Sequence, residues 1–86
     1  MGKYEKLILR ILKAKSDNNI KFEDLRNLLL KLGFDERVKG SHHVFRKEDV
    51  VDKINIQRDG PLAKAYQVKQ VRRVIVENDL SGFENQ

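Results

Sequence analysis

The spacing of the apolar residues changes at Gly33, and this change limits the folds open to the chain. The leucines before it recur at intervals of three and four, as on one face of an amphipathic helix: Leu25, Leu28, Leu29 and Leu32. The apolar residues after it fall in short, largely alternating segments, as in strands with one buried face. The sequence therefore predicts a helix that ends at a glycine and is followed by a sheet.

The predicted helix covers roughly residues 22–32. Asp24 falls at its third position, where a carboxylate favours the exposed N–H groups and the positive end of the helix dipole. Lys21 at the N-cap position is a poor capping residue, but Ile20 and Leu25 have the spacing of a hydrophobic staple.

Three short segments after this helix are predicted strands: FDERVK (34–39), HHVFRK (42–47) and KINIQ (53–57). The predicted turns are Gly40-Ser41, KEDVVD (47–52) and Asp59-Gly60-Pro61. The orientation of the middle strand stays open, because Val44 and Phe45 are adjacent and point to opposite faces.

Two further helices are predicted, over residues 3–15 and 63–78, with a turn at 15–19 after the first. The last carries Val68, Val71 and Ile75 on one face and a basic stripe beside it: Lys69, Arg72 and Arg73. The expected fold class is α+β in the order α-α-β-β-β-α. The second and third helices would cover one face of a three-stranded antiparallel sheet.

Length and charge limit the function classes. A chain of 86 residues has room for one core and thus one domain, 1–86. Its net charge of +5 suits a polyanionic partner and equally suits simple solubility. It has no cysteine, and no apolar run long enough to cross a bilayer, so we expect a soluble cytoplasmic protein with no membrane partner.

The adjacent histidines His42 and His43 invite three chemical interpretations. Neighbours on a strand point to opposite faces, so they do not chelate one metal ion. Ser41 beside His42 lacks a recognisable nucleophile motif and suits a turn. A histidine beside Lys39 and Arg46 fits general base catalysis on RNA, which supplies its own nucleophile. The plainer interpretation, two polar residues at the start of a strand, is the one that the pattern alone favours.

The predicted helix at 22–32 followed by strands also resembles the opening of a winged helix domain, with the strands as the wing. That fold would make the protein a DNA-binding regulator. A helix-turn-helix requires a recognition helix soon after, however, and strands are predicted there instead.

Residues 22–79 resemble the core of the HicA toxin family. The resemblance rests on a Leu-Gly-Phe that ends a helix, a Gly-Ser-His-His-x-Phe stretch, a third strand and a C-terminal helix. In this sequence these are Gly33-Phe34, Lys39 to His43 with Phe45, residues 54–57, and the helix around QVKQVRRVI.

The resemblance implies a fold like the double-stranded RNA-binding domain and an mRNA-cleaving toxin of a type II toxin–antitoxin system. It also implies neutralisation by a HicB-type antitoxin protein, and catalysis without a metal or small-molecule cofactor. The histidine directly after Gly-Ser, here His42, would be the general base. The residues predicted to bind RNA are Lys39, Ser41, His43, Arg46, Lys47, Arg72 and Arg73.

The sequence departs from the family at three places. Relatives often carry a His-Pro-Asp-Gly turn, where this chain has Lys47-Glu48-Asp49. They also often carry a second histidine near the third strand, where this chain has Asn55 and Gln57, so no general acid is evident. Residues 1–19 form an extra N-terminal helix and turn before the family-like core at 20–79, and residues 80–86 are expected to form a loose tail. A non-catalytic RNA-binding module of the same fold is the alternative.

Overall fold

The structure, a computed structural model, describes residues 2–81. Its elements in chain order are α1 (Lys3–Lys13), η1 (Asp17–Asn19), α2 (Phe22–Lys31), β1 (Asp35–Lys39), β2 (His42–Lys47), β3 (Val50–Ile56), β4 (Arg58–Asp59), β5 (Leu62–Ala63) and α3 (Ala65–Glu77). The predicted α+β class and the order of the main elements are confirmed.

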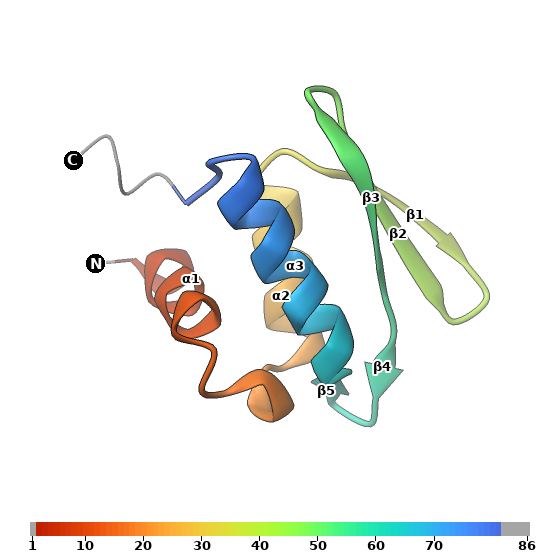
Figure 1. Ribbon diagram of the computed structural model, residues 1–86. Helices are drawn as coiled ribbons and strands as arrows, with labels where there is room; N and C mark the ends of the chain where they lie inside the picture. The colour runs from red at the N-terminus through yellow and green to blue at the C-terminus, as the bar shows by residue number, and fades with distance from the viewer. Residues whose placement is uncertain (1, 82–86) are drawn as a thin grey trace.

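The helices and the sheet form layers (Figure 1). Strands β1, β2 and β3 make an antiparallel sheet in that order, and a small second sheet pairs β4 with β5. Helices α2 and α3 lie on one face of the larger sheet, as predicted, and α1 packs against both of them on the side away from the sheet. The opposite, outer face of the sheet is not covered by any helix of the described chain.

Phe45 settles the orientation of β2, which the sequence left open. Its side chain is fully buried and pairs in register with Ile54 of β3, which is also fully buried. Because paired residues of an antiparallel ladder share a face, the core face carries Phe45, Ile54 and Ile56. The outer face therefore carries His42 and Val44.

Helix α1 belongs to the same core as the rest of the chain. Leu7, Ile8 and Ile11 are buried in one apolar cluster together with residues of α2, α3 and the sheet. Arg72 links α3 to α1 and η1, since its guanidinium donates to the Ile11 carbonyl at 3.2 Å and to Asp17 at 2.9 Å. The N-terminal segment is therefore packed against the rest of the chain through shared apolar contacts.

Four predicted helix boundaries shift by one or two residues: the ends of α1, α2 and α3 and the start of α3. Helix α1 ends at Lys13 because Ala14 adopts a left-handed conformation, with φ of 59°. Helix α3 begins at Ala65 because β5 occupies Leu62–Ala63, where it pairs with β4 and bridges to Lys21. The predicted turn at Asp59-Gly60-Pro61 is thus the tip of a short hairpin that the sequence analysis missed.

The predicted turn at 47–52 and the predicted tail at 80–86 also differ from the structure. Strand β3 begins at Val50, so the turn is shorter than predicted, and the β2–β3 register shifts between Phe45 and Lys47. Leu80 packs on the core, and its N–H donates to the Ile75 carbonyl at 2.9 Å. Residues 82–86 of the predicted tail lie outside the described part of the chain.

Gly33 ends α2 as predicted. Its φ of 99° lies in the left-handed region, which glycine adopts at little steric cost. The next residue, Phe34, is buried and its N–H donates to the Leu29 carbonyl at 3.0 Å. Within residues 2–81, every helix falls short of the length and apolar content that a bilayer span needs.

The orientation of β2 can be tested with adjacent substitutions. Phe45→Ala empties a fully buried site and should lower the free energy of unfolding by about 3–5 kcal/mol. Val44→Ala, on the outer face, should lower it by less than about 1 kcal/mol. Urea unfolding followed by circular dichroism measures both. Equal effects, or a larger effect at Val44, would contradict the inward placement of Phe45.

Candidate active site

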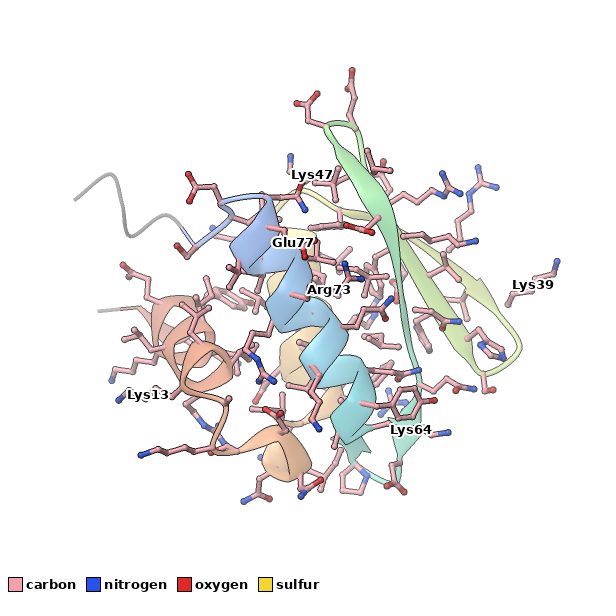
Figure 2. The ribbon with its side chains drawn as sticks, in the orientation of Figure 1. Lys13, Lys39, Lys47, Lys64, Arg73 and Glu77 are labelled. Atoms are coloured by element: carbon pink, nitrogen blue, oxygen red, sulfur yellow. The ribbon has the colours of Figure 1, made fainter. Side chains whose placement is uncertain are left out.

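His42 lies at the start of β2, and its side chain is exposed on the outer face of the sheet. Gly40, with φ of 61°, forms the tight turn that brings the chain back from β1. In the β1–β2 register His42 is paired with Lys39, whose side chain extends away from the helices in Figure 2. The imidazole is therefore exposed to solvent and lies next to a lysine on the neighbouring strand.

Two amide side chains from the third strand and its end hold the imidazole. His42 Nδ1 lies 3.2 Å from Asn55 Nδ2 and 3.4 Å from Asn55 Oδ1. His42 Nε2 lies 3.5 Å from Gln57 Nε2, a long contact. The same Gln57 nitrogen donates to Ser41 Oγ at 3.2 Å. Ser41 and Gln57 thus flank one edge of the ring, and Asn55 flanks the other.

The partners of Gln57 orient its amide group toward the imidazole. Lys64 Nζ donates to Gln57 Oε1 at 3.5 Å, which turns the amide nitrogen of Gln57 toward Ser41 and His42. Both ring nitrogens of His42 therefore face an amide group, Nδ1 that of Asn55 and Nε2 that of Gln57.

A buried glutamine of α3 positions Gln57. Gln67 is 4% exposed, and its Oε1 accepts the backbone N–H of Gln57 at 2.5 Å. A buried polar side chain of this kind requires a partner, and here the partner is the backbone directly after β3. The link fixes the end of β3 relative to α3, and it fixes the place from which the Gln57 side chain reaches His42.

His43 has a different environment, on the core-facing side of the sheet. Its Nδ1 lies 2.8 Å from Glu36 Oε2, and its ring meets the ring of Phe22 edge-on, with centroids 4.8 Å apart. The guanidinium of Arg26 in α2 donates bidentate hydrogen bonds of 2.8–3.0 Å to the same carboxylate. His43 is therefore part of a network that joins β1 and β2 to α2.

This network lowers the pKa of the Glu36 carboxyl below its ordinary value of 4.5. The hydrogen bond from Arg26 is the main cause, and the hydrogen bond from His43 acts in the same direction, against the opposing effect of burial. Arg58 completes the surroundings, since its guanidinium lies 4.4 Å from the Phe22 ring centroid and pairs with Glu23.

The structure brings three of the predicted RNA-binding residues to the side of the sheet that carries His42. Lys39 and Arg46 are exposed on the outer face, and Ser41 lies in the turn beside the imidazole. His43 lies in the network described above. Lys47 is at the end of β2 farthest from His42 (Figure 2). Its side chain lies over Gly33, since a Cβ added to that glycine would be 3.3 Å from Lys47 Nζ.

The two predicted arginines of α3 are committed to carboxylates. Arg72 is held by Asp17 on the side of α1, away from the sheet. Arg73 pairs with Glu77 at 3.1 Å and with Asp52 at 3.8 Å. Their sequence spacing indicates a basic stripe, but the carboxylates that neutralise it come partly from other elements, which spacing along one helix does not reveal.

Asn55 and Gln57, which contact His42, and Lys64, which contacts Gln57, were not among the predicted site residues. A signal for two of them exists in the sequence. The alternation of KINIQ places Asn55 and Gln57 on the face opposite Ile54 and Ile56. Only the inward placement of Phe45 turns that face into the one that carries His42.

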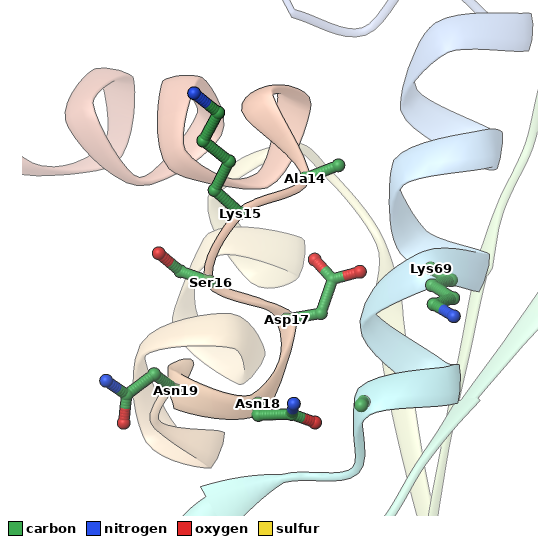
Figure 3. Close-up of a pocket in the computed structure, with 8 residues that line it drawn as sticks. Ala14, Lys15, Ser16, Asp17, Asn18, Asn19 and Lys69 are labelled. Atoms are coloured by element: carbon green, nitrogen blue, oxygen red, sulfur yellow. The ribbon is translucent and has the colours of Figure 1, made fainter.

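A groove of about 500 Å³, away from His42, lies between η1 and α3 (Figure 3). It is lined by Ala14, Lys15, Ser16, Asp17, Asn18, Asn19, Ala65 and Lys69. Its acidic side chain, Asp17, is paired with Arg72, so the groove lacks an uncommitted carboxylate. Over residues 2–81, no three His, Asp or Glu side chains gather in the way that a metal site needs.

Comparisons of the chain with protein-family models, with curated proteins and with solved structures give no match.

The Glu36 network predicts a pH dependence of stability. The pKa of Glu36 is lower in the folded state than its ordinary value, so the ionised carboxylate adds to the free energy of unfolding. This stabilisation is complete above about pH 4.5 and is lost as the pH falls through the folded-state pKa. Glu36→Gln should cost about 1.5–3 kcal/mol of unfolding free energy at pH 7. It should also lose less further stability than the wild type when acidified to about pH 3.

Urea unfolding at several pH values measures this difference. Asp35→Asn is the matched control, since Asp35 is the exposed neighbour of Glu36 and has no ion pair within the described residues. The control should keep the wild-type pH profile. An unchanged profile in Glu36→Gln would contradict the assigned role of the carboxylate.

Proposed function

We propose that this protein is an endoribonuclease that cleaves RNA without a metal ion, with His42 as the general base. The observation that supports this best is the exposed imidazole that the amides of Asn55 and Gln57 hold beside Lys39. A positioned, water-accessible base next to cations is what transfer of a phosphoryl group within RNA requires.

The chemistry needs no nucleophile from the protein. A ring nitrogen of His42 takes the proton of a ribose 2′-hydroxyl, and the 2′-oxygen attacks the adjacent phosphorus. The bond from phosphorus to the 5′-oxygen breaks, and that oxygen takes a proton from water. The imidazolium returns its proton to the resulting hydroxide, and the products are a 2′,3′-cyclic phosphate and a free 5′-hydroxyl. Lys39 is paired with His42 in the strand register and Lys64 contacts Gln57, and these two lysines would stabilise the negative charge that develops on the phosphorus oxygens.

The resemblance to HicA toxins supplies the biological setting of the proposal. In that setting the substrate is mRNA, the site of action is the cytoplasm, and the partner is a HicB-type antitoxin that neutralises the protein. Growth inhibition on expression of this chain, relieved by the product of an adjacent reading frame, is the expected result. Absence of both effects would contradict the toxin assignment while leaving the ribonuclease assignment to the tests below.

His42→Ala should reduce the rate of RNA cleavage by about 100-fold or more, since it removes the general base. His43→Gln keeps a hydrogen-bonding side chain beside Glu36 and should retain cleavage within about tenfold of the wild type. Cleavage of a labelled RNA under single-turnover conditions measures both variants, and circular dichroism verifies that each is folded.

Chelator controls make this test specific. Cleavage by the wild type should be unchanged in EDTA, which separates it from a contaminating metal-dependent nuclease. Undiminished cleavage by His42→Ala would exclude His42 as the base. RNA retention without any cleavage products by the wild type would favour the alternative, a non-catalytic RNA-binding module.

The amide contacts of His42 predict a separate effect on turnover. Asn55→Leu keeps the size of the side chain but removes the partner that holds Nδ1, so kcat should fall by roughly 10- to 100-fold with little change in KM. Asn27→Leu, a half-buried amide on α2, is the matched control and should leave kcat unchanged. Steady-state kinetics decide the matter, and a rise in KM alone would assign Asn55 to substrate binding instead.

A further inference from the structure

The outer face of the sheet is strongly cationic. Arg37 and Lys39 of β1, Arg46 of β2 and Lys53 of β3 are all exposed there, and Asp35 is the acidic side chain among them. The strand register places these residues in rows, with Asp35 opposite Arg46, Arg37 opposite Val44, and Lys39 opposite His42. The positive charge therefore extends along the strands and ends at the imidazole.

The arginines of this face differ from the others in their partners. Arg37 and Arg46 have no hydrogen bond or ion pair within the described residues. Each other arginine is committed: Arg10 to the Asn19 carbonyl, Arg26 to Glu36, Arg58 to Glu23, Arg72 to Asp17, and Arg73 to Glu77. The arginines of the helical side are thus paired within the fold, and the two arginines of the outer face are left for a ligand from solution.

The cationic side chains enclose a groove of about 450 Å³, lined by Asp35, Arg37, Lys39, Val44, Arg46 and Lys53. Val44 is the apolar residue of the lining, and no aromatic side chain contributes to it. Lys39 belongs both to the groove and to the row of His42. A chain-like anion lying in the groove would therefore reach the base at one end.

We infer that this outer face, here called the sheet groove, binds the phosphate backbone of single-stranded RNA and guides it to His42. The inference rests on the proposed function for its catalytic end, and on charge complementarity for its ligand. Arg37 and Lys53, which the sequence analysis did not assign to binding, become phosphate contacts together with Arg46. Arginine suits this role because its planar donors match phosphate oxygens.

The shape and composition of the groove select a single strand. Successive rows along a strand are separated by two residues, about 7 Å, which is comparable with the phosphate spacing of an extended single strand. The ribose of a nucleotide in a duplex also keeps its 2′-hydroxyl in a fixed geometry, whereas attack on the phosphorus needs a flexible backbone. With no aromatic platform for base stacking, binding should depend little on the bases.

The test measures binding to RNA that stays intact. The His42→Ala background removes cleavage, and fluorescence anisotropy with a labelled single-stranded oligonucleotide gives the Kd at several salt concentrations. The double substitution R37Q/K53Q removes two charges from the sheet groove. The matched control, K15Q/K69Q, removes two charges from the exposed lysines of the groove between η1 and α3 (Figure 3).

R37Q/K53Q should weaken binding at least tenfold and reduce the slope of log Kd against log salt by about 1.4, the value for two phosphate contacts. K15Q/K69Q should stay within about twofold of the parent. The same RNA annealed to its complement should bind more weakly than the single strand, and oligonucleotides of different base composition should bind alike.

Equal weakening by both double variants would overturn the inference, because it would indicate diffuse attraction to a basic protein. No weakening by R37Q/K53Q would overturn it as well, and so would tighter binding of polyglutamate than of RNA, which would assign the face to an acidic protein segment. Wild-type protein that binds through this face but never cleaves would refute the proposed function and leave the inference standing.

Discussion

The burial of Phe45 against Ile54 is the interaction on which the rest of the structure depends. Side chains of a strand alternate between faces, so the burial of one aromatic ring decides on which face each of the remaining side chains of β2 lies. With Phe45 inside, His43 meets Glu36 and Phe22 beneath the sheet, and His42 stands in water on the other side. The two adjacent histidines thus differ in role because the sheet separates them.

Charge is distributed across the sheet in the same two-sided way. On the helical side, guanidinium groups pair with carboxylates and join elements that are distant in sequence, as Arg72 does with Asp17 and Arg26 with Glu36. Such pairs add directional contacts to a small core that includes α1. On the outer face, Arg37 and Arg46 have no partner among the described residues.

The main helices and strands could be predicted from the sequence, because they follow from the spacing of apolar residues and from glycines that end helices or form turns. Both are local signals. The β4–β5 hairpin could not, because two-residue strands around Gly60 have no periodic pattern and are held by contacts to Lys21. The site was predicted at His42 through its motif, but its amide partners depend on which face Phe45 occupies, and adjacent Val44 and Phe45 leave that undecided.

The accessibility and chemical role of His42 can be measured together by acylation of the imidazoles with diethyl pyrocarbonate, with mass-spectrometric fragmentation to separate positions 42 and 43. The account predicts that His42 is modified well before His43, that the loss of RNA cleavage follows the modification of His42, and that bound single-stranded RNA slows it. Faster modification of His43, or full cleavage by protein acylated at His42, would contradict the account.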